Sequence, residues 1–314
     1  MLSIQSLSHT YPNGTCALDA VSLDIPAGMF GLLGPNGAGK SSLMRCLATL
    51  QVPSAGQIHF GGIDVLRQPA ELRATLGYLP QDFGVYPRVS AAELLAHLAV
   101  LKGVAGRGER RDTVEALLRQ VNLWDVRNKA VAGFSGGMRQ RFGIAQALIG
   151  NPRLIIVDEP TAGLDPEERN RFNNLLSEIG ENVVVILSTH IVDDVTDLCP
   201  RMAILVAGRI VLTGTPAELI AALAGRIWQA SIERHELDAA RTRYPVIATR
   251  LRGGRTVIRV LGDAPPGVGF VPVEAGLEDV YFATLHQQRQ AAPPQAALPQ
   301  TALPQSALPP TQSA

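Results

Sequence analysis

A glycine-rich stretch near the start of the chain constrains the fold more than any other feature. Residues 34–41 match the pattern G-x-x-x-x-G-K-[ST] at every fixed position; they are Gly34, Pro35, Asn36, Gly37, Ala38, Gly39, Lys40 and Ser41. The apolar run at 29–33 predicts a buried strand before the match. The segment 42–50 predicts a helix after it, because Leu43, Leu47 and Leu50 would share one face.

A strand, a glycine loop and a helix in this order form a physical site for phosphate, whereas the bland alternative is a chance match in a glycine-rich turn. Glycine has no Cβ and reaches positive φ, so the backbone can wrap closely around a phosphate. The helix N-terminus adds about half a positive charge. We therefore expect nucleotide binding by residues 34–41 and Ser42, with Lys40 at the β- and γ-phosphates and the Ser41 hydroxyl on Mg²⁺.

Composition narrows the class of protein. The 314 residues suffice for one large domain and a small one. Lys and Arg number 28, as do Asp and Glu, so no net basic charge favours binding to nucleic acid. No stretch approaches the roughly 20 apolar residues of a membrane span, and the N-terminus has no basic-then-apolar secretion signal. We expect a soluble protein that reaches a membrane only through a partner.

The three cysteines show no pattern of a metal site or a disulfide framework. Cys16, Cys46 and Cys199 are far apart in the chain and odd in number. We therefore expect all three to be small core residues in a reducing cytosol.

Alternating strands and helices over the first two hundred residues predict an α/β fold with a mostly parallel sheet. Apolar–polar alternation at 1–33 and 56–66 predicts an N-terminal antiparallel β subdomain beside that sheet. Further strands are expected at 76–81, 154–159 and 183–190, and a helix at 167–180. From about residue 85 to 150 the spacing of leucine and valine becomes helical, which predicts an inserted helical subdomain.

Polar side chains follow the two most apolar of these strands. The run 154–157 suits a strand buried on both faces, and it ends in Asp158 and Glu159. Unpaired buried carboxylates are costly, so we expect a cation or partner there; a solvated acidic strand end is the alternative. His190 ends the next such strand, where ligands bind in open α/β sheets. A lone histidine is usually structural, but this shared position favours a functional role.

Two further features are weak by themselves. Ser135 is a good helix N-cap, and with Gly136 and Gly137 it makes a second helix start that can receive an anion. Ser-Gly-Gly nevertheless occurs in many loops. Tyr11 precedes the glycine-rich stretch and has a ring that can stack on a base, but an ordinary strand tyrosine is the simpler interpretation of the residue alone.

Together and in this order, the motifs resemble those of the ATP-binding subunit of ABC transporters, over roughly residues 2–220. The 34–41 segment resembles the Walker A loop of that family, and 154–159 resembles its Walker B strand. The other matches are the Q-loop glutamine (Gln81), the signature motif (Ser135, Gly136 and Gly137), the D-loop (163–165), the switch histidine (His190) and the adenine-stacking aromatic (Tyr11).

The signature motif departs from the family pattern, which is normally Leu-Ser-Gly-Gly-Gln. Phe134 replaces the leucine, and Met138 replaces the glutamine. The serine and both glycines remain, so we expect the substitution of Met138 to tune the site rather than to abolish it.

The resemblance implies a mechanism in which two ATP-binding domains meet head to tail. Each ATP would lie between the Walker A loop of one chain and the signature motif of the other, with Asp165 of the D-loop also at the nucleotide. Glu159 would polarise the attacking water, and His190 would contact the γ-phosphate. Ser41, Asp158 and Gln81 would hold Mg²⁺, and Gln81 would also link the site to a membrane subunit.

After residue 220 the family pattern fades. Strand-like runs at 227–232 and 256–260 and a hairpin turn at 252–255 predict a small α+β appendage over residues 221–289. Its closing segment, 277–282, resembles that of ATPases paired with ABC-2-type export permeases. From residue 290 onward, Ala-Leu-Pro-Gln repeats predict an extended, disordered tail.

The function expected from this resemblance is ATP hydrolysis that drives a separate membrane permease, with export favoured over import. The chain would bind a second ATP-binding subunit and lie at the cytoplasmic face of the membrane. The alternative is a soluble ABC ATPase that acts on ribosomes or DNA. Such proteins usually carry two fused ATPase domains or long coiled coils, whereas this chain has one phosphate loop and no run of heptads.

Overall fold

The computed structural model describes residues 1–84, 86–180 and 183–291. Its centre is a six-stranded sheet in the order β10-β9-β3-β8-β7-β6, in which β10 is antiparallel to β9 and the other neighbours are parallel. The strands are β3 (Gly28–Leu33), β6 (Leu76–Leu79), β7 (Leu154–Asp158), β8 (Val184–Thr189), β9 (Arg201–Val206) and β10 (Arg209–Gly214). The predicted α/β fold is confirmed.

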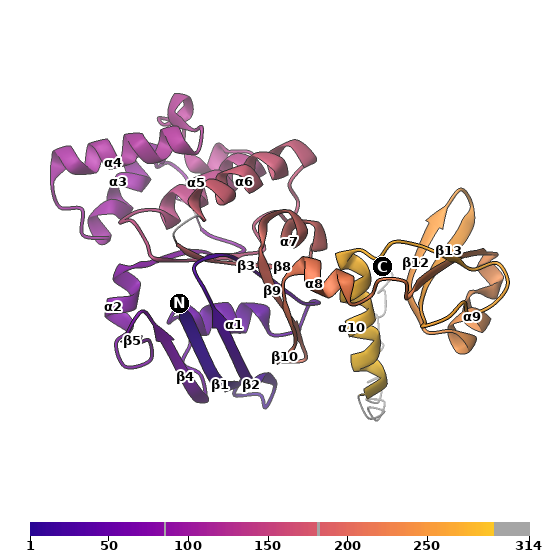
Figure 1. Cartoon of the computed structure of the whole chain (residues 1–314). Coiled ribbons are helices and arrows are strands. Elements are labelled where there is room, and N and C mark those ends of the chain that lie inside the picture. Colours follow the sequence, from indigo (N-terminus) through magenta and orange to yellow (C-terminus); the bar gives the residue numbers. More distant parts are fainter. Residues whose placement is uncertain (85, 181–182, 292–314) are drawn as a thin grey trace, which may run out of the picture.

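A second, antiparallel sheet in the order β2-β1-β4-β5 lies below the central sheet in the view of Figure 1. Its strands are β1 (Leu2–Thr10), β2 (Cys16–Ile25), β4 (Ala55–Phe60) and β5 (Ile63–Asp64). Helices α1 (Lys40–Leu47) and α2 (Pro69–Ala74) belong to the same side. One apolar cluster joins this sheet and α1 to the central sheet, through side chains such as Ile4, Leu43 and Ile156.

Helix α1 is shorter than its leucine spacing predicts. It ends at Leu47, and Thr49 beyond it has a positive φ of 58°. Leu43 and Leu47 are buried as expected, but Leu50 lies outside the helix with 63% of its surface exposed. The expectation that Leu50 belongs to the buried helical face was therefore wrong, because the chain turns before reaching it.

Helices form a separate layer above the central sheet (Figure 1). They are α3 (Ala91–Leu101), α4 (Arg107–Gln120), α5 (Gly136–Ala147), α6 (Pro166–Ile179) and α7 (Val192–Leu198), with short 3₁₀ turns at Trp124–Val126 and Val131–Gly133. Ser90 and Glu93 form a reciprocal capping box at the start of α3. Phe142 of α5 and Phe172 of α6 are fully buried, and they tie this layer to the main core.

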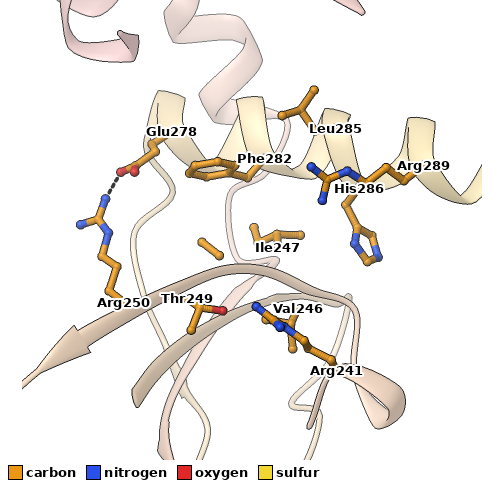
Figure 2. Close-up of a pocket in the computed structure, with 11 residues that line it drawn as sticks. Arg241, Val246, Ile247, Thr249, Arg250, Glu278, Phe282, Leu285, His286 and Arg289 are labelled. Carbon is orange, nitrogen blue, oxygen red and sulfur yellow. Dashed lines mark hydrogen bonds and ion pairs between the residues drawn. The ribbon is translucent and has the colours of Figure 1, made fainter. Parts of the chain in front are cut away.

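The C-terminal region is a third sheet with helices, in the strand order β12-β13-β11-β14. Its elements are α8 (Pro216–Ala221), β11 (Ile227–Ile232), a 3₁₀ turn at Arg234–Glu236, α9 (Leu237–Arg243), β12 (Val246–Arg252), β13 (Arg255–Leu261), β14 (Val271–Pro272) and α10 (Leu277–Ala291). Gly253 and Gly254 form the turn between β12 and β13, where the sequence predicts a hairpin. A hollow lies between α10 and β12 (Figure 2).

Helix α10 packs against α7, beside the central sheet, instead of ending the appendage apart from it. Leu277, Val280 and Tyr281 join the same buried cluster as Val195 of α7. The helix continues to Ala291, past the boundary at 289 that the sequence suggests. The sequence assigns Gln290 and Ala291 to the disordered tail, which was wrong because both belong to α10. The rest of the predicted tail, from 292 onward, lies outside the described residues.

The structure also tests the expectations about membrane-spanning helices and about burial of the three cysteines. No helix in the described part of the chain is both long and apolar enough to cross a bilayer. Cys46 and Cys199 are buried, and burial raises the pKa of these thiols to about 11 and about 12. Cys16 is exposed on β2, so the expectation that it is a core residue was wrong.

Candidate functional site

The phosphate loop, residues 34–41, runs from the end of β3 into the first turn of α1. Gly37 and Gly39 have φ values of 80° and 105°, which lie in the left-handed region that favours glycine. A Cβ on Gly39 would also lie 2.3 Å from the carbonyl oxygen of Ala17. The backbone angles therefore favour glycine at both positions, and the close approach of Ala17 also leaves no room for a side chain at Gly39.

Lys40 connects the phosphate loop to the end of β7. Its Nζ donates a hydrogen bond to the carbonyl oxygen of Gly34 at 2.7 Å and lies 3.1 Å from Oε1 of Glu159. The two side chains of this ion pair are only 5% and 9% exposed. A desolvated ammonium group thus lies beside the loop, at the edge of the sheet where β7 ends.

The Glu159 carboxylate lies between Lys40 and His190. Its backbone has a positive φ of 50°, and its N–H donates to the carbonyl oxygen of Ser188 at 2.8 Å. Its other carboxylate oxygen, Oε2, lies 2.8 Å from Nδ1 of His190. Because β7 and β8 are neighbouring parallel strands, the structure brings together the two predicted strand-end residues and Lys40.

Asp158 is the adjacent buried carboxylate. Burial raises its pKa and the nearby Glu159 adds to the rise, whereas the hydroxyls of Ser188 and Ser41 and the ammonium of Lys40 act in the opposite direction. The side chain is 3% exposed, and its Oδ1 has no hydrogen-bond partner within the described structure. A buried, unsatisfied carboxylate oxygen beside a serine hydroxyl is an environment that a cation would satisfy.

These donors fit Mg²⁺ better than a metal bound by protein alone. Among the described residues there is no group of three or more His, Cys, Asp and Glu side chains that would hold a metal ion. Mg²⁺ usually takes one or two protein oxygens and completes its coordination with water and substrate phosphates. Asp158 and Ser41 would supply that small set.

The structure places Tyr11 at the start of α1, whereas in the described part of the chain the Gln81 side chain makes no hydrogen bond to the residues at the end of β7. The Tyr11 hydroxyl is 2.9 Å from Oγ of Ser42, so the ring lies next to the start of α1. Gln81 follows β6, which pairs with β7, and therefore leaves the sheet at the same edge as Asp158. Its side chain is exposed, and within the described residues it makes no hydrogen bond to the Lys40–Glu159–His190 cluster.

The signature motif, residues 135–137, begins helix α5. The Ser135 hydroxyl accepts a hydrogen bond from the Met138 N–H at 3.2 Å and so caps the helix as predicted from the residue type. Ser135 and Gly136 are exposed, so this helix start faces solvent. In the part of the chain that the structure describes, no hydrogen bond or ion pair joins it to the phosphate loop.

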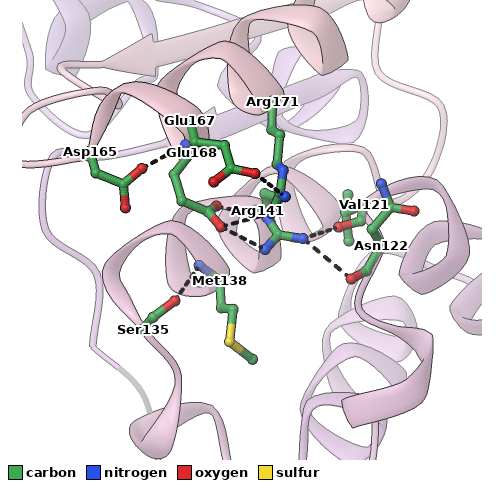
Figure 3. Close-up of polar contacts among 9 residues, drawn as sticks. All are labelled: Val121, Asn122, Ser135, Met138, Arg141, Asp165, Glu167, Glu168 and Arg171. Carbon is green, nitrogen blue, oxygen red and sulfur yellow. Dashed lines mark hydrogen bonds and ion pairs between the residues drawn. The ribbon is translucent and has the colours of Figure 1, made fainter.

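Polar contacts connect the signature helix to helix α6 (Figure 3). Asp165 caps α6 by accepting a hydrogen bond from the Glu168 N–H at 2.9 Å. The Glu168 carboxylate packs against Gly137, and its Oε2 lies 3.3 Å from Nε of the buried Arg141. Arg141 also donates to the carbonyl oxygens of Val121 and Asn122. Asp165 and the signature motif therefore lie in one connected set of contacts between α5 and α6.

Sequence reasoning missed a second buried network, centred on Asp194 of α7. This carboxylate is fully buried and accepts hydrogen bonds from Thr161 at 2.5 Å and from Nε of Arg169 at 2.7 Å. Thr161 follows Glu159 by two residues and Asp194 follows His190 by four, so the network fixes both segments. The sequence gave no clear signal for this network, because α7 contains three aspartates and aspartate is usually exposed.

Comparisons with known proteins identify the family. Residues 18–162 match the family model described as ABC transporter. The phosphonates import ATP-binding protein of Synechococcus sp. is 36% identical over 247 residues, which cover 73% of this chain and 90% of that protein. The chain belongs to the ABC transporter family. It is an ATP-binding subunit of that family and an ATPase.

A drug-resistance ATP-binding protein and a solved ATP-binding cassette are also similar to this chain. The daunorubicin resistance ATP-binding protein of Streptomyces coeruleorubidus is 34% identical over 269 residues, covering 83% of this chain and 85% of that protein. A dimeric ATP-binding cassette, solved in a post-hydrolysis state with ADP and phosphate, superposes with a TM-score of 0.63. It is 26% identical, and the match covers 68% of this chain and 98% of that one.

Proposed function

We propose that two copies of this ABC ATPase pair head to tail and drive a separate membrane permease. The observation that carries the proposal is the division of the site into two faces. One face holds the phosphate loop with Lys40, Glu159 and His190, and the other presents the exposed helix start at Ser135 and Gly136. A second copy would complete the first face with its own signature motif and Asp165, as in a dimeric cassette.

Each residue of the catalytic face has a proposed role. The backbone of residues 34–41 and Ser42 surrounds the phosphates, and Tyr11 stacks on adenine. Lys40 exchanges its contact with Glu159 for the β- and γ-phosphates, since a phosphate attracts the ammonium more strongly than one carboxylate does. Glu159 then accepts a hydrogen bond from the attacking water, and His190, already within 2.8 Å of it, orients that carboxylate and contacts the γ-phosphate.

Mg²⁺ fits beside Ser41 and Asp158, where it would neutralise phosphate charge. Gln81 is proposed as a further oxygen ligand that reports the presence of nucleotide, because it leaves the sheet at the same edge. Its exposed position in the described structure is consistent with a side chain that moves when the site fills. The barrier to phosphoryl transfer would fall mainly through positioning and charge stabilisation.

The permease contact is proposed at an apolar groove of about 430 Å³ between the end of α1, α3 and α5. Leu50 and Leu101 line it with 63% and 70% of their surfaces exposed, which is unusual for leucine and typical of an interaction surface. A short amphipathic helix at the cytoplasmic side of the permease would bury these side chains. The ATPase would then be held at the cytoplasmic face of the membrane.

Export is the proposed direction of transport. The similar proteins include one named for drug resistance and one named for phosphonate import, so similarity of the ATPase core does not set the direction. The alignment with the resistance protein covers 83% of this chain and therefore reaches well past residue 220, into the C-terminal region. This agreement beyond the shared core supports export.

The test is Mg²⁺-dependent ATP hydrolysis measured against protein concentration, with Glu159→Gln beside the wild type. We expect specific activity to rise with concentration, and the variant to form an ATP-bound dimer in light scattering while losing about 10²–10⁴-fold in turnover. Glu178→Gln, an exposed glutamate of α6, is the matched control. Hydrolysis by a monomer, or near-normal turnover of Glu159→Gln, would overturn the composite site.

A further inference from the structure

The C-terminal region contains a hollow that the proposed ATPase function does not use. It has a volume of about 700 Å³ and lies between α10 and β12 (Figure 2). Consecutive residues 246–250 of β12 line one side of it, together with Arg241 of α9. Phe282, Leu285 and Arg289 of α10 line the other side. A hollow lined by a continuous stretch of strand suits an extended ligand better than a compact one.

Strand β12 lies at the edge of its sheet and, within the described residues, pairs only with β13. The turn at Gly253 and Gly254 has two residues, so the closing pair Arg252–Arg255 exchanges both backbone hydrogen bonds. Bonded pairs alternate along an antiparallel ladder. The backbone N–H and C=O groups of Thr249 and Leu251 therefore point away from β13, toward the open edge.

The opposite wall is one face of helix α10. Glu278, Phe282, Leu285 and Arg289 are spaced by four, three and four residues, which places them in one stripe. Phe282 and Leu285 form an apolar wall, and Ile247 of β12 is buried beside them. An edge strand facing the apolar wall of a helix across a hollow is the arrangement in which proteins bind an extended peptide as an added strand.

The charges in the hollow are uneven. At one end, Arg250 is paired with Glu278 (Figure 2). At the other end lie Arg241, His286 and Arg289, and among the described residues no acidic side chain forms an ion pair with either arginine. Residues 292–314, which follow α10, contain no Asp or Glu. The occupant that complements this end carries negative charge.

We propose that this hollow binds an extended acidic segment of a partner protein, which adds as a strand to β12. Its backbone bonds Thr249 and Leu251, and its apolar side chains pack on Phe282 and Leu285. Its Asp or Glu side chains meet Arg241 and Arg289. Backbone pairing gives the affinity, and the two arginines select for charge at one end.

The test is a display selection of random peptides, about ten residues long to match a strand and its flanks, on the full-length protein. Counter-selection uses the double variant Arg241→Glu/Arg289→Glu. Both side chains are exposed and remote from the ATP site, so this variant should fold and hydrolyse ATP as the wild type does. We expect enrichment of peptides with alternating apolar residues and acids at one end, and affinity at least about tenfold lower for the double variant.

A second measurement separates strand addition from adhesion to a basic surface. Hydrogen exchange on the complex should show new protection of the Thr249 and Leu251 amides, and N-methylation of alternate peptide nitrogens should abolish binding in one register only. Selected peptides that bind the double variant equally well, or that leave β12 unprotected, would overturn the proposal. If the double variant instead changes the oligomeric state without peptide, the occupant is a second copy of this chain and the proposal is wrong.

Discussion

Replacing Gly137 by alanine tests whether packing against Glu168 fixes the signature motif. A Cβ on Gly137 would lie 2.2 Å from Oε2 and 2.5 Å from Cδ of Glu168, distances that real Cβ atoms do not show. A Cβ on the neighbouring Gly136 would meet only the Leu164 side chain, at 3.9 Å. Both substitutions add the same methyl group to the first turn of α5, so their difference isolates the contact with Glu168 (Figure 3).

The magnitude follows from what Glu168 leaves behind when it moves. Arg141 and Glu168 are 10% and 18% exposed and 3.3 Å apart, and losing one partner of a fully buried pair costs about 3–5 kcal/mol. This pair is partly solvated, its hydrogen-bond alignment is poor, and Arg141 keeps two carbonyl acceptors at 3.1 and 3.2 Å. We expect Gly137→Ala to lower the free energy of unfolding by about 1.5–3 kcal/mol.

The assay is urea denaturation of the nucleotide-free protein, followed by circular dichroism. Gly136→Ala should be neutral or should stabilise by up to about 1 kcal/mol, because alanine is the better helix former. On a Glu168→Ala background the steric conflict is gone, so adding Gly137→Ala should cost less than about 0.5 kcal/mol. Stability is measured without nucleotide because both glycines are proposed to contact the partner's ATP.

Two results would refute this reasoning. Equal stability of Gly136→Ala and Gly137→Ala would show that Glu168 yields without cost. If Gly137→Ala lowers the free energy of unfolding by the same amount on the Glu168→Ala background, the strain arises elsewhere in the helix.

Three further predictions follow from the buried charges and the exposed groove. Burial raises the pKa of Asp158, so its stabilising contribution is present at low pH and is lost as pH rises through the raised value. Asp158→Asn should therefore raise the thermal midpoint at about pH 7, lose that advantage at about pH 4, and abolish Mg²⁺-dependent hydrolysis. Asp194→Asn weakens the contacts with Arg169 and Thr161 and should cost about 2–4 kcal/mol in urea denaturation, whereas the exposed Asp193→Asn should cost little. Leu101→Glu should reduce co-purification with the permease while ATP hydrolysis by the isolated subunit is retained. Val268→Glu, at a more exposed position remote from the groove, is the control, and equal recovery of both variants would exclude the groove.

Much of the site could be predicted because its requirements are local. Gly37 and Gly39 must be glycine to adopt their backbone angles, and the apolar runs before Asp158 and His190 can be buried only as central strands. Parallel strands place their ends at one edge of the sheet, so the proximity of Glu159 and His190 followed from the strand pattern. The same reasoning failed for Leu50, because helix spacing does not show where a helix ends.

The phosphate loop, the α/β sheet and the identity of the residues at its edge are predictable from the amino-acid sequence, since each is encoded in a short segment. The contact of Lys40 with Glu159, the packing of Glu168 on Gly137, and the packing of α10 against α7, with β12 left as an open edge, are visible only in the folded chain. These contacts join segments far apart in the chain, and many pairings of buried charges and apolar faces are compatible with the same local patterns. Packing selects one of them because every buried polar group must find its partner at the same time.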